Sequence, residues 1–160
     1  MQAPVELLKR LFAALTRAEW VPILLVRLAL GYEFASSGWG KVHHLEKITK
    51  YFESLHIPAP GFNATLTAST ELVGGTLVLL GLGTRFAAAP LAFTMVIAIL
   101  TARLHEGMCP GDGPPATLSD LLYLSEPAFL LMFVWLVFSG GGKASVDHLI
   151  ALRGEKAKGK

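Results

Sequence analysis

Residues 21–40 read VPILLVRLALGYEFASSGWG, a largely apolar run that contains one arginine and one glutamate. A run of about 20 apolar residues has the length of a helix that crosses a bilayer. Trp20 and Trp39 lie at its two ends, where tryptophan anchors membrane helices in the interface. Further apolar runs follow at residues 65–82, 86–101 and 121–138. The sequence therefore predicts four transmembrane helices.

The composition of the whole chain agrees with a membrane environment. Of its 160 residues, 52% are hydrophobic and 16% are charged, whereas a soluble domain has about 25% charged residues. The mean hydropathy is +0.52, and a soluble chain of this length has too small a core to bury so many apolar side chains. We therefore expect an all-α fold, an integral membrane four-helix bundle surrounded by the lipid bilayer. The formal net charge of +2, with basic residues near both ends, gives no indication of nucleic-acid binding.

The segment before the first run has the pattern of an amphipathic helix. Between residues 5 and 19 the apolar side chains that share one helical face are Val5, Leu8, Phe12 and Leu15. A segment of this kind lies in the membrane interface rather than across the bilayer. The sequence thus predicts an interfacial helix at 1–20, the four-helix bundle at 21–140 and a basic tail at 141–160. We expect no cleavable signal peptide, because the first apolar run is too long for one.

The distribution of basic residues predicts the orientation of the chain. Lys and Arg residues outside the four runs are more numerous on the side that carries both termini than in the loops on the other side, at about 41–64 and 104–119. Cytoplasmic segments of membrane proteins are enriched in Lys and Arg. We therefore expect a multi-pass protein of the cytoplasmic (inner) membrane with both termini in the cytoplasm.

The ionisable residues inside the predicted spans are Arg27, Glu33, Glu71 and Glu126. Such groups are costly in a bilayer unless they are paired or hydrated, so each marks a candidate functional site. Counting about 1.5 Å per residue from the span ends places the three glutamates in one layer, with Arg27 deeper. A protonatable layer of this kind suits proton-coupled quinone chemistry or ion binding.

These charges have more than one interpretation. In the functional one, Glu71 carries the proton or quinone chemistry, Arg27 is its ionic partner, and Glu33 and Glu126 lie beside it. In a structural one, Arg27 pairs with one glutamate only to hold helices together. A third interpretation places one of the glutamates at the true membrane interface, because the helices begin and end at other residues than the apolar runs do.

A stripe of residues at spacings of four and three runs along one face of the first span, and consists of Arg27, Gly31, Phe34, Gly38 and Lys41. Gly74 and Gly75 follow Glu71 on the second span. Small residues let two helices approach closely, so helix packing is the expected role of these glycines. The alternative is that this face lines a quinone pocket.

The outer loops contain a candidate metal site made of His43, His44, His105 and Cys109, with Met108 nearby. Imidazole and sulfur ligands suit a copper-type metal, although the spacing matches no recognised motif and solvated histidines are the alternative. Cys109 either forms a disulfide with another chain or is inert. Because every histidine lies in a loop or at a helix end and there is one cysteine, we expect no haem or iron–sulfur centre within this chain.

Three segments together resemble the DoxX family of small four-span membrane proteins: 27–41 (RLALGYEFASSGWGK), 71–85 (ELVGGTLVLLGLGTR) and 139–147 (SGGGKASVD). The matching residues are those of the stripe, then Glu71, Gly74, Gly75 and Gly81, and finally Gly142, Ser145 and Asp147. Glu33, Glu126, Cys109 and the histidine pair lie outside this pattern. From the residue types alone, Ser145 and Asp147 are expected to cap a short helix at 146–152.

The resemblance implies a membrane subunit or partner of a redox system. Members are similar to the membrane part of thiosulfate:quinone oxidoreductase, and others are associated with superoxide dismutase and sulfurtransferase. The leading hypothesis is a subunit that binds a quinone between its helices and passes protons through Glu71. The alternative is a non-catalytic anchor or assembly factor for soluble redox or metal-handling partners. A small transporter is less favoured, because four spans show no duplicated half. The expected partners are proteins of a redox complex or further copies of this chain.

Overall fold

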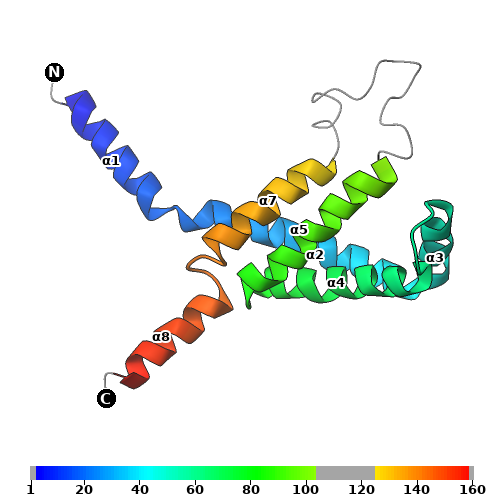
Figure 1. The fold of residues 1–160 in the computed structure, drawn as a ribbon. Helices are drawn as coiled ribbons and strands as arrows, with labels where there is room; N and C mark the ends of the chain where they lie inside the picture. Colours follow the sequence, from blue (N-terminus) through cyan, green and yellow to red (C-terminus); the bar gives the residue numbers. More distant parts are fainter. Residues whose placement is uncertain (1–2, 104–124, 159–160) are drawn as a thin grey trace.

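The computed structural model describes residues 3–103 and 125–158, and every regular element within these ranges is a helix (Figure 1). The all-α prediction is therefore confirmed. In chain order the helices are α1 (Ala3–Arg17), α2 (Trp20–His43), α3 (Leu45–Ser54), α4 (Pro60–Leu80), α5 (Thr84–Ala98), the π-helical turn η1 (Ile99–Arg103), α7 (Ser125–Ser139) and α8 (Val146–Lys158).

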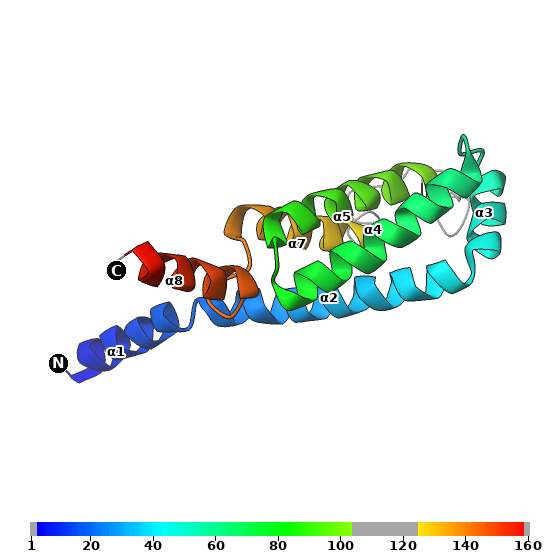
Figure 2. The ribbon, with the colours of Figure 1, turned by 90° about the horizontal axis from the view of Figure 1, so that it is seen from below.

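Four long helices, α2, α4, α5 and α7, pack side by side into a bundle (Figures 1 and 2). Contacts join α2 to α4, α4 to α5, α5 to α7 and α7 back to α2, so the four helices form a closed ring. The terminal helices α1 and α8 both leave the bundle at the same end. We call this the Arg27 end, and the opposite end, where α2 meets α3, the Lys41 end.

The outward faces of the bundle are apolar. Large hydrophobic side chains on all four helices are exposed, and the most exposed of them, Phe86, is 87% exposed. A soluble monomer rarely exposes so much apolar surface, whereas the hydrocarbon of a bilayer covers it without cost. Within the described residues, the segment Thr84–Thr101 is long and apolar enough by itself to cross a membrane. Polar residues lower the hydropathy of α2 and α4, and the described part of α7 has 15 residues.

Glycines set the register between α2 and α4. A Cβ atom added to Gly31 would lie 2.5 Å from the backbone nitrogen of Leu79, and one added to Gly38 or Gly75 would meet the facing backbone even more closely. The packing role predicted for these glycines is therefore confirmed. The close contacts pair Gly31 with Leu79 and Gly38 with Leu72, so paired positions in the two antiparallel helices have numbers that sum to 110.

A tight turn joins α4 to α5 at the Arg27 end. Gly81 and Gly83 adopt left-handed conformations with φ of 72° and 57°. Glycine occupies this region without the steric cost that a Cβ atom imposes, and it commonly ends helices there. The turn brings α5 back against α4 within residues 81–83, and its backbone N–H and C=O groups are part of a polar cluster described below.

Helix α3 covers the Lys41 end of the bundle, in a segment expected from the sequence to be a loop (Figure 2). Its apolar residues Leu45, Ile48 and Phe52 recur at helical spacing, a signal that the sequence does contain. The register places the first residue of α4, Pro60, well beyond the end of α2, and α3 packs against this overhanging part of α4.

Candidate functional site

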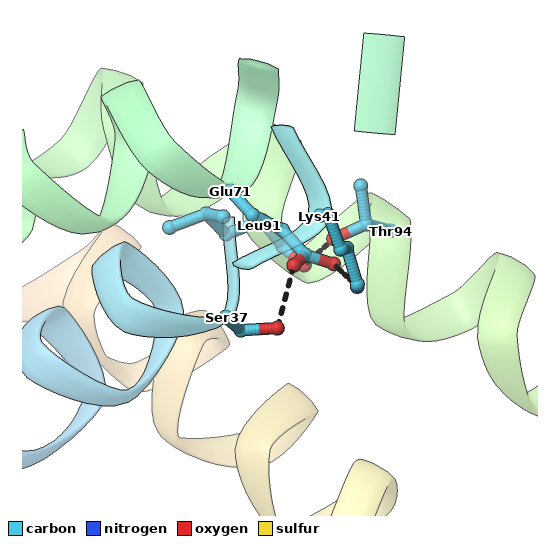
Figure 3. A network of polar contacts seen from close by, with 5 residues as sticks. All are labelled: Ser37, Lys41, Glu71, Leu91 and Thr94. Carbon is cyan, nitrogen blue, oxygen red and sulfur yellow. Dashed lines mark hydrogen bonds and ion pairs between the residues drawn. The ribbon is translucent and has the colours of Figure 1, made fainter. Parts of the chain in front are cut away.

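The carboxylate of Glu71 lies inside the bundle, where its side chain is paired through both oxygens (Figure 3). The ammonium of Lys41 donates a hydrogen bond to Oε1 at 2.5 Å, and the hydroxyl of Ser37 donates one to Oε2 at 3.0 Å. Glu71 is 2% exposed, whereas the side chain of Lys41 is 29% exposed. The pair therefore joins a buried carboxylate to a partly exposed cation.

The local sequence explains this geometry. Ser37 and Lys41 are four residues apart on α2 and so share one helical face. Gly38 lies between them and lets the backbone of α4 approach at the level of Glu71. A carboxylate buried in a membrane protein is costly unless it is paired and hydrogen-bonded. The close approach of the two helices places both partners where Glu71 needs them.

A cavity of about 840 Å³ opens beside this ion pair, among α2, α3, α4, α5 and α7. Most of its wall is apolar, with aromatic rings that include Phe34, Phe52, Phe93 and Phe129. Ser37, Lys41 and Glu71 contribute polar groups to one side. A pocket of a few hundred to about 1,000 Å³ with an apolar wall and a few convergent polar groups is typical of small-molecule sites.

Glu33 and Glu126 line the same cavity, but the predicted single layer of carboxylates is wrong. The α2–α4 register places Glu33 opposite residue 77, six residues and so about 9 Å along the axis from Glu71. Glu33 is exposed, and Glu126 is half-buried and accepts a hydrogen bond from Ser125 at 3.2 Å. The depth estimate failed because α4 begins well beyond the end of α2.

Arg27 does not contact Glu71, so the predicted ionic partnership is also wrong. Its Nη1 donates to the carbonyl of Gly141 at 2.6 Å and its Nη2 to the carbonyl of Ala144 at 2.7 Å. The register places Arg27 near the α4–α5 turn, whereas Glu71 lies opposite residue 39, about 18 Å away along the axis. The guanidinium extends toward the α7–α8 connection instead of along its own helix.

The end of the family-like segment 139–147 forms a polar cluster with the α4–α5 turn. The carboxylate of Asp147 accepts hydrogen bonds from the backbone N–H groups of Gly83 at 2.7 Å and Thr84 at 3.1 Å. Asp147 therefore caps α5, not its own helix α8 as expected. Ser145 does cap α8, because its Oγ accepts a hydrogen bond from the N–H of His148 at 3.2 Å. The negative charge of Asp147 also acts on the guanidinium of Arg27.

The predicted metal site is not assembled by the described residues, among which no group of three or more His, Cys, Asp and Glu side chains gathers. The Nδ1 atom of His43 is bonded to the carbonyl of Trp39 at 2.8 Å. His44 follows at the end of α2, and His105 and Cys109 lie outside the described residues.

Two features of the site were missed from the sequence. Ser37 was not singled out, although its spacing of four from Lys41 is the signal that would have found it. Lys41 was named only as part of the glycine-containing stripe, without its role as the partner of Glu71. Both residues lie on the face of α2 that meets α4, and that face is what the stripe correctly predicts.

Two relatives that are similar to this chain are named as membrane proteins. The family model described as DoxX matches residues 23–104, just over half of the chain. The "Uncharacterized membrane protein Rv3486" of Mycobacterium tuberculosis is 37% identical over 149 residues, which cover 87% of this chain and 88% of that protein. The "Inner membrane protein YqjF" of Escherichia coli is 29% identical over 135 residues, which cover 84% of this chain and 95% of that protein.

A third relative carries a functional name. The "Putative oxidoreductase CatD" of Bacillus subtilis is 37% identical over 81 residues, which cover 51% of this chain and 59% of that protein. No solved structure matches the chain.

Proposed function

Because this chain belongs to the DoxX family of membrane proteins, we propose that it is the membrane subunit of a redox system and binds a quinone in the cavity beside Glu71. The observation that carries the proposal is the buried Glu71–Lys41 pair on one wall of a large apolar cavity. The name of the Bacillus subtilis relative adds support for a redox role.

The chemistry of a quinone headgroup fits this wall. The headgroup is a flat apolar ring with two carbonyl oxygens that accept hydrogen bonds, and the aromatic side chains of the cavity suit its faces. The Nζ atom of Lys41 lies on the polar side of the cavity and has two further N–H donors besides the one that it donates to Glu71, whereas the single hydroxyl proton of Ser37 is already donated to Glu71. One carbonyl oxygen of the quinone would accept from Lys41 while the ring lies against the apolar wall.

Glu71 and Lys41 would handle the protons of the reaction. Conversion of a quinone to a quinol takes up two electrons and two protons. Glu71 adjoins the cavity and Lys41 is partly exposed, so protons would pass from water through Lys41 and Glu71 to the quinone oxygens. The electrons would come from a redox partner protein, because the sequence offers no ligand set for a haem or an iron–sulfur centre within the spans.

The substitution Glu71→Gln tests the proposal. The glutamine side chain would keep the size of the glutamate, its amide oxygen would accept from Lys41, and its NH2 group would donate to the oxygen of Ser37, so the bundle should remain folded. We expect about a tenfold loss of quinone affinity, equivalent to about 1.4 kcal/mol, because a neutral amide does not form an ion pair with the ammonium of Lys41, and the donor that the headgroup would bind then loses its fixed position. Quinone retained after mild extraction, measured by mass spectrometry, is the readout.

The matched control is Glu46→Gln on α3, where the carboxylate is exposed and paired with Lys50. This variant should retain quinone as the parent chain does. If the Glu71→Gln variant also retained quinone, or if the parent chain never bound any, the quinone proposal would be refuted.

A specific observation favours a second candidate function, a non-catalytic membrane anchor for redox partners. Both carboxylate oxygens of Glu71 already have partners within the chain, as expected if the pair only fixes the register of α2 and α4. In that case Glu71→Gln would leave the capture of partner proteins unchanged, and substitutions on the exposed surfaces of α1 or α8 would abolish it.

We further propose that both termini lie in the cytoplasm. Both terminal helices leave the bundle at the Arg27 end, and the exposed residues Leu8, Phe12 and Leu15 of α1 share one face, as in a helix that lies in the membrane interface. Basic residues are concentrated at this end. A reporter fused after residue 160 that is active only in the cytoplasm should be active, and activity of a periplasm-specific reporter there would reverse the orientation.

A further inference from the structure

A second hollow lies on the outside of the bundle, in the groove between α4 and α5, with a volume of about 680 Å³. Its walls are mainly apolar, and they include Val73 and Leu77 on α4 and Phe86 on α5. Val73 is 57% exposed, so the groove opens outward to the face that the bilayer covers. Gly74 lies in its floor above the side chain of Leu91.

The groove and the interior cavity meet between the two helices. Thr70 of α4 and Pro90 of α5 line both hollows, so the groove and the cavity are adjacent at this level. Glu71 is the neighbour of Thr70 and lines the cavity just inside this junction. A proline inside a helix removes one backbone hydrogen bond and typically bends the helix. The helical ladder of α5 is thus interrupted where the two hollows adjoin.

We propose that the groove holds the isoprenoid tail of the quinone whose headgroup lies beside Glu71, and that the molecule enters sideways from the bilayer between α4 and α5. This inference rests on the proposed function. It names the ligand class more closely, as a long-tailed membrane quinone and not a small water-soluble one. Thr70 and Pro90 form the passage between the headgroup site and the tail site.

The shape of the groove favours a tail over another occupant. The groove follows α4 from Ser69 to Leu77, for about 12 Å, and continues along the α4–α5 turn at Leu82 and Gly83, as a long flexible chain would. One end of the groove lies at Thr70 and Pro90, which also line the cavity beside Glu71, and Gly83 and Asp147 line the other end. The part between the two ends is largely apolar, so an amphiphile with its polar head beside Glu71 would place its apolar tail there. A helix of a second copy would fill the groove but would leave the passage to the cavity without a function.

The test compares two probes, a long-tailed ubiquinone and its analogue with a single isoprene unit, for binding to the purified full chain in nanodiscs. The variant Ser69→Trp fills the groove from an exposed position on α4. The matched control, Thr76→Trp, changes an exposed position of the same helix that lines neither hollow. Val73→Trp serves as a second groove variant in case Ser69→Trp folds poorly, as judged by circular dichroism.

We expect Ser69→Trp to bind the long-tailed quinone about tenfold more weakly, equivalent to about 1.4 kcal/mol, and to bind the short analogue as before. Thr76→Trp should bind both probes normally. Unchanged binding of the long-tailed quinone by both groove variants, or an equal loss for both probes, would overturn the tail site while leaving the headgroup site intact. Failure of the parent chain to bind either probe would instead refute the proposed function itself.

Discussion

Replacement of Arg27 by methionine tests the view that this arginine joins the bundle to its C-terminal segment. Arg27 is 3% exposed, and its guanidinium donates to the carbonyls of Gly141 and Ala144. Methionine fills a similar length of apolar space and removes the guanidinium. Residues 140–147 would then lose their main attachment to α2. The Glu71 site, about 18 Å distant along the axis, should be unaffected.

The expected cost follows from the two hydrogen bonds. A hydrogen bond to a charged group contributes about 1.5–3 kcal/mol. We take the lower end for each, because Nε of Arg27 is buried without a hydrogen-bond partner among the described residues and its desolvation already offsets part of the gain. The sum is about 3 kcal/mol, which lowers the melting temperature of a chain of this size by about 6–12 °C.

Thermal unfolding in mild detergent, followed by circular dichroism, measures this change, and hydrogen exchange locates it. Faster exchange is expected at Gly83 and Thr84, whose N–H groups depend on the position of Asp147. The exposed Arg153→Met variant is the matched control and should melt like the parent chain. An unchanged melting temperature for Arg27→Met would refute the reasoning. A loss of quinone by Arg27→Met as large as that of Glu71→Gln would also refute it, because the two sites lie about 18 Å apart along the axis.

Further predictions concern the close helix contact and the distant cap. Gly38→Ala should destabilise the bundle by about 1–3 kcal/mol, because its Cβ atom would collide with the backbone of α4. Gly40→Ala, with open space around it, should be neutral or stabilise α2 by up to about 1 kcal/mol, and chemical unfolding of the pair shows the contrast. Asp147→Ala should lower the free energy of unfolding by about 0.5–2 kcal/mol, because it removes the cap of α5. Amide hydrogen exchange at Gly83 should become faster, and unaltered exchange there would contradict the capping role.

The main architecture was accessible from sequence because it depends on local pattern. Apolar runs of membrane-spanning length predict the four bundle helices, and the spacing of Gly31 and Gly38 predicts which face of α2 meets another helix. Glu71 was identified as central because a carboxylate inside an apolar run needs a partner. These inferences require only periodicity and the cost of burying charge.

The residues that pair with Glu71 and with Asp147 could not be predicted from the sequence in the same way. The choice between Lys41 and Arg27 as the partner of Glu71 depends on the axial offset between α2 and α4, which no pattern within one helix contains. The role of Asp147 depends on a loop that returns its carboxylate to a helix start 64 residues earlier in the chain. Both are long-range relations, and they are set by glycine contacts and turn geometry.

The hydrogen bond from Gly83 to Asp147 also has a consequence for the order in which parts of the fold form during synthesis. A ribosome completes α4 and α5 well before it adds the residue that caps the start of α5. Until then the N–H groups of Gly83 and Thr84 lack this acceptor, and Arg27 lacks its carbonyl partners in residues 141–144. In a nascent chain halted ahead of Asp147, the inserted helix α5 should therefore still lack the cap on its first turn. The cap forms only when residues 139–147 have been synthesised.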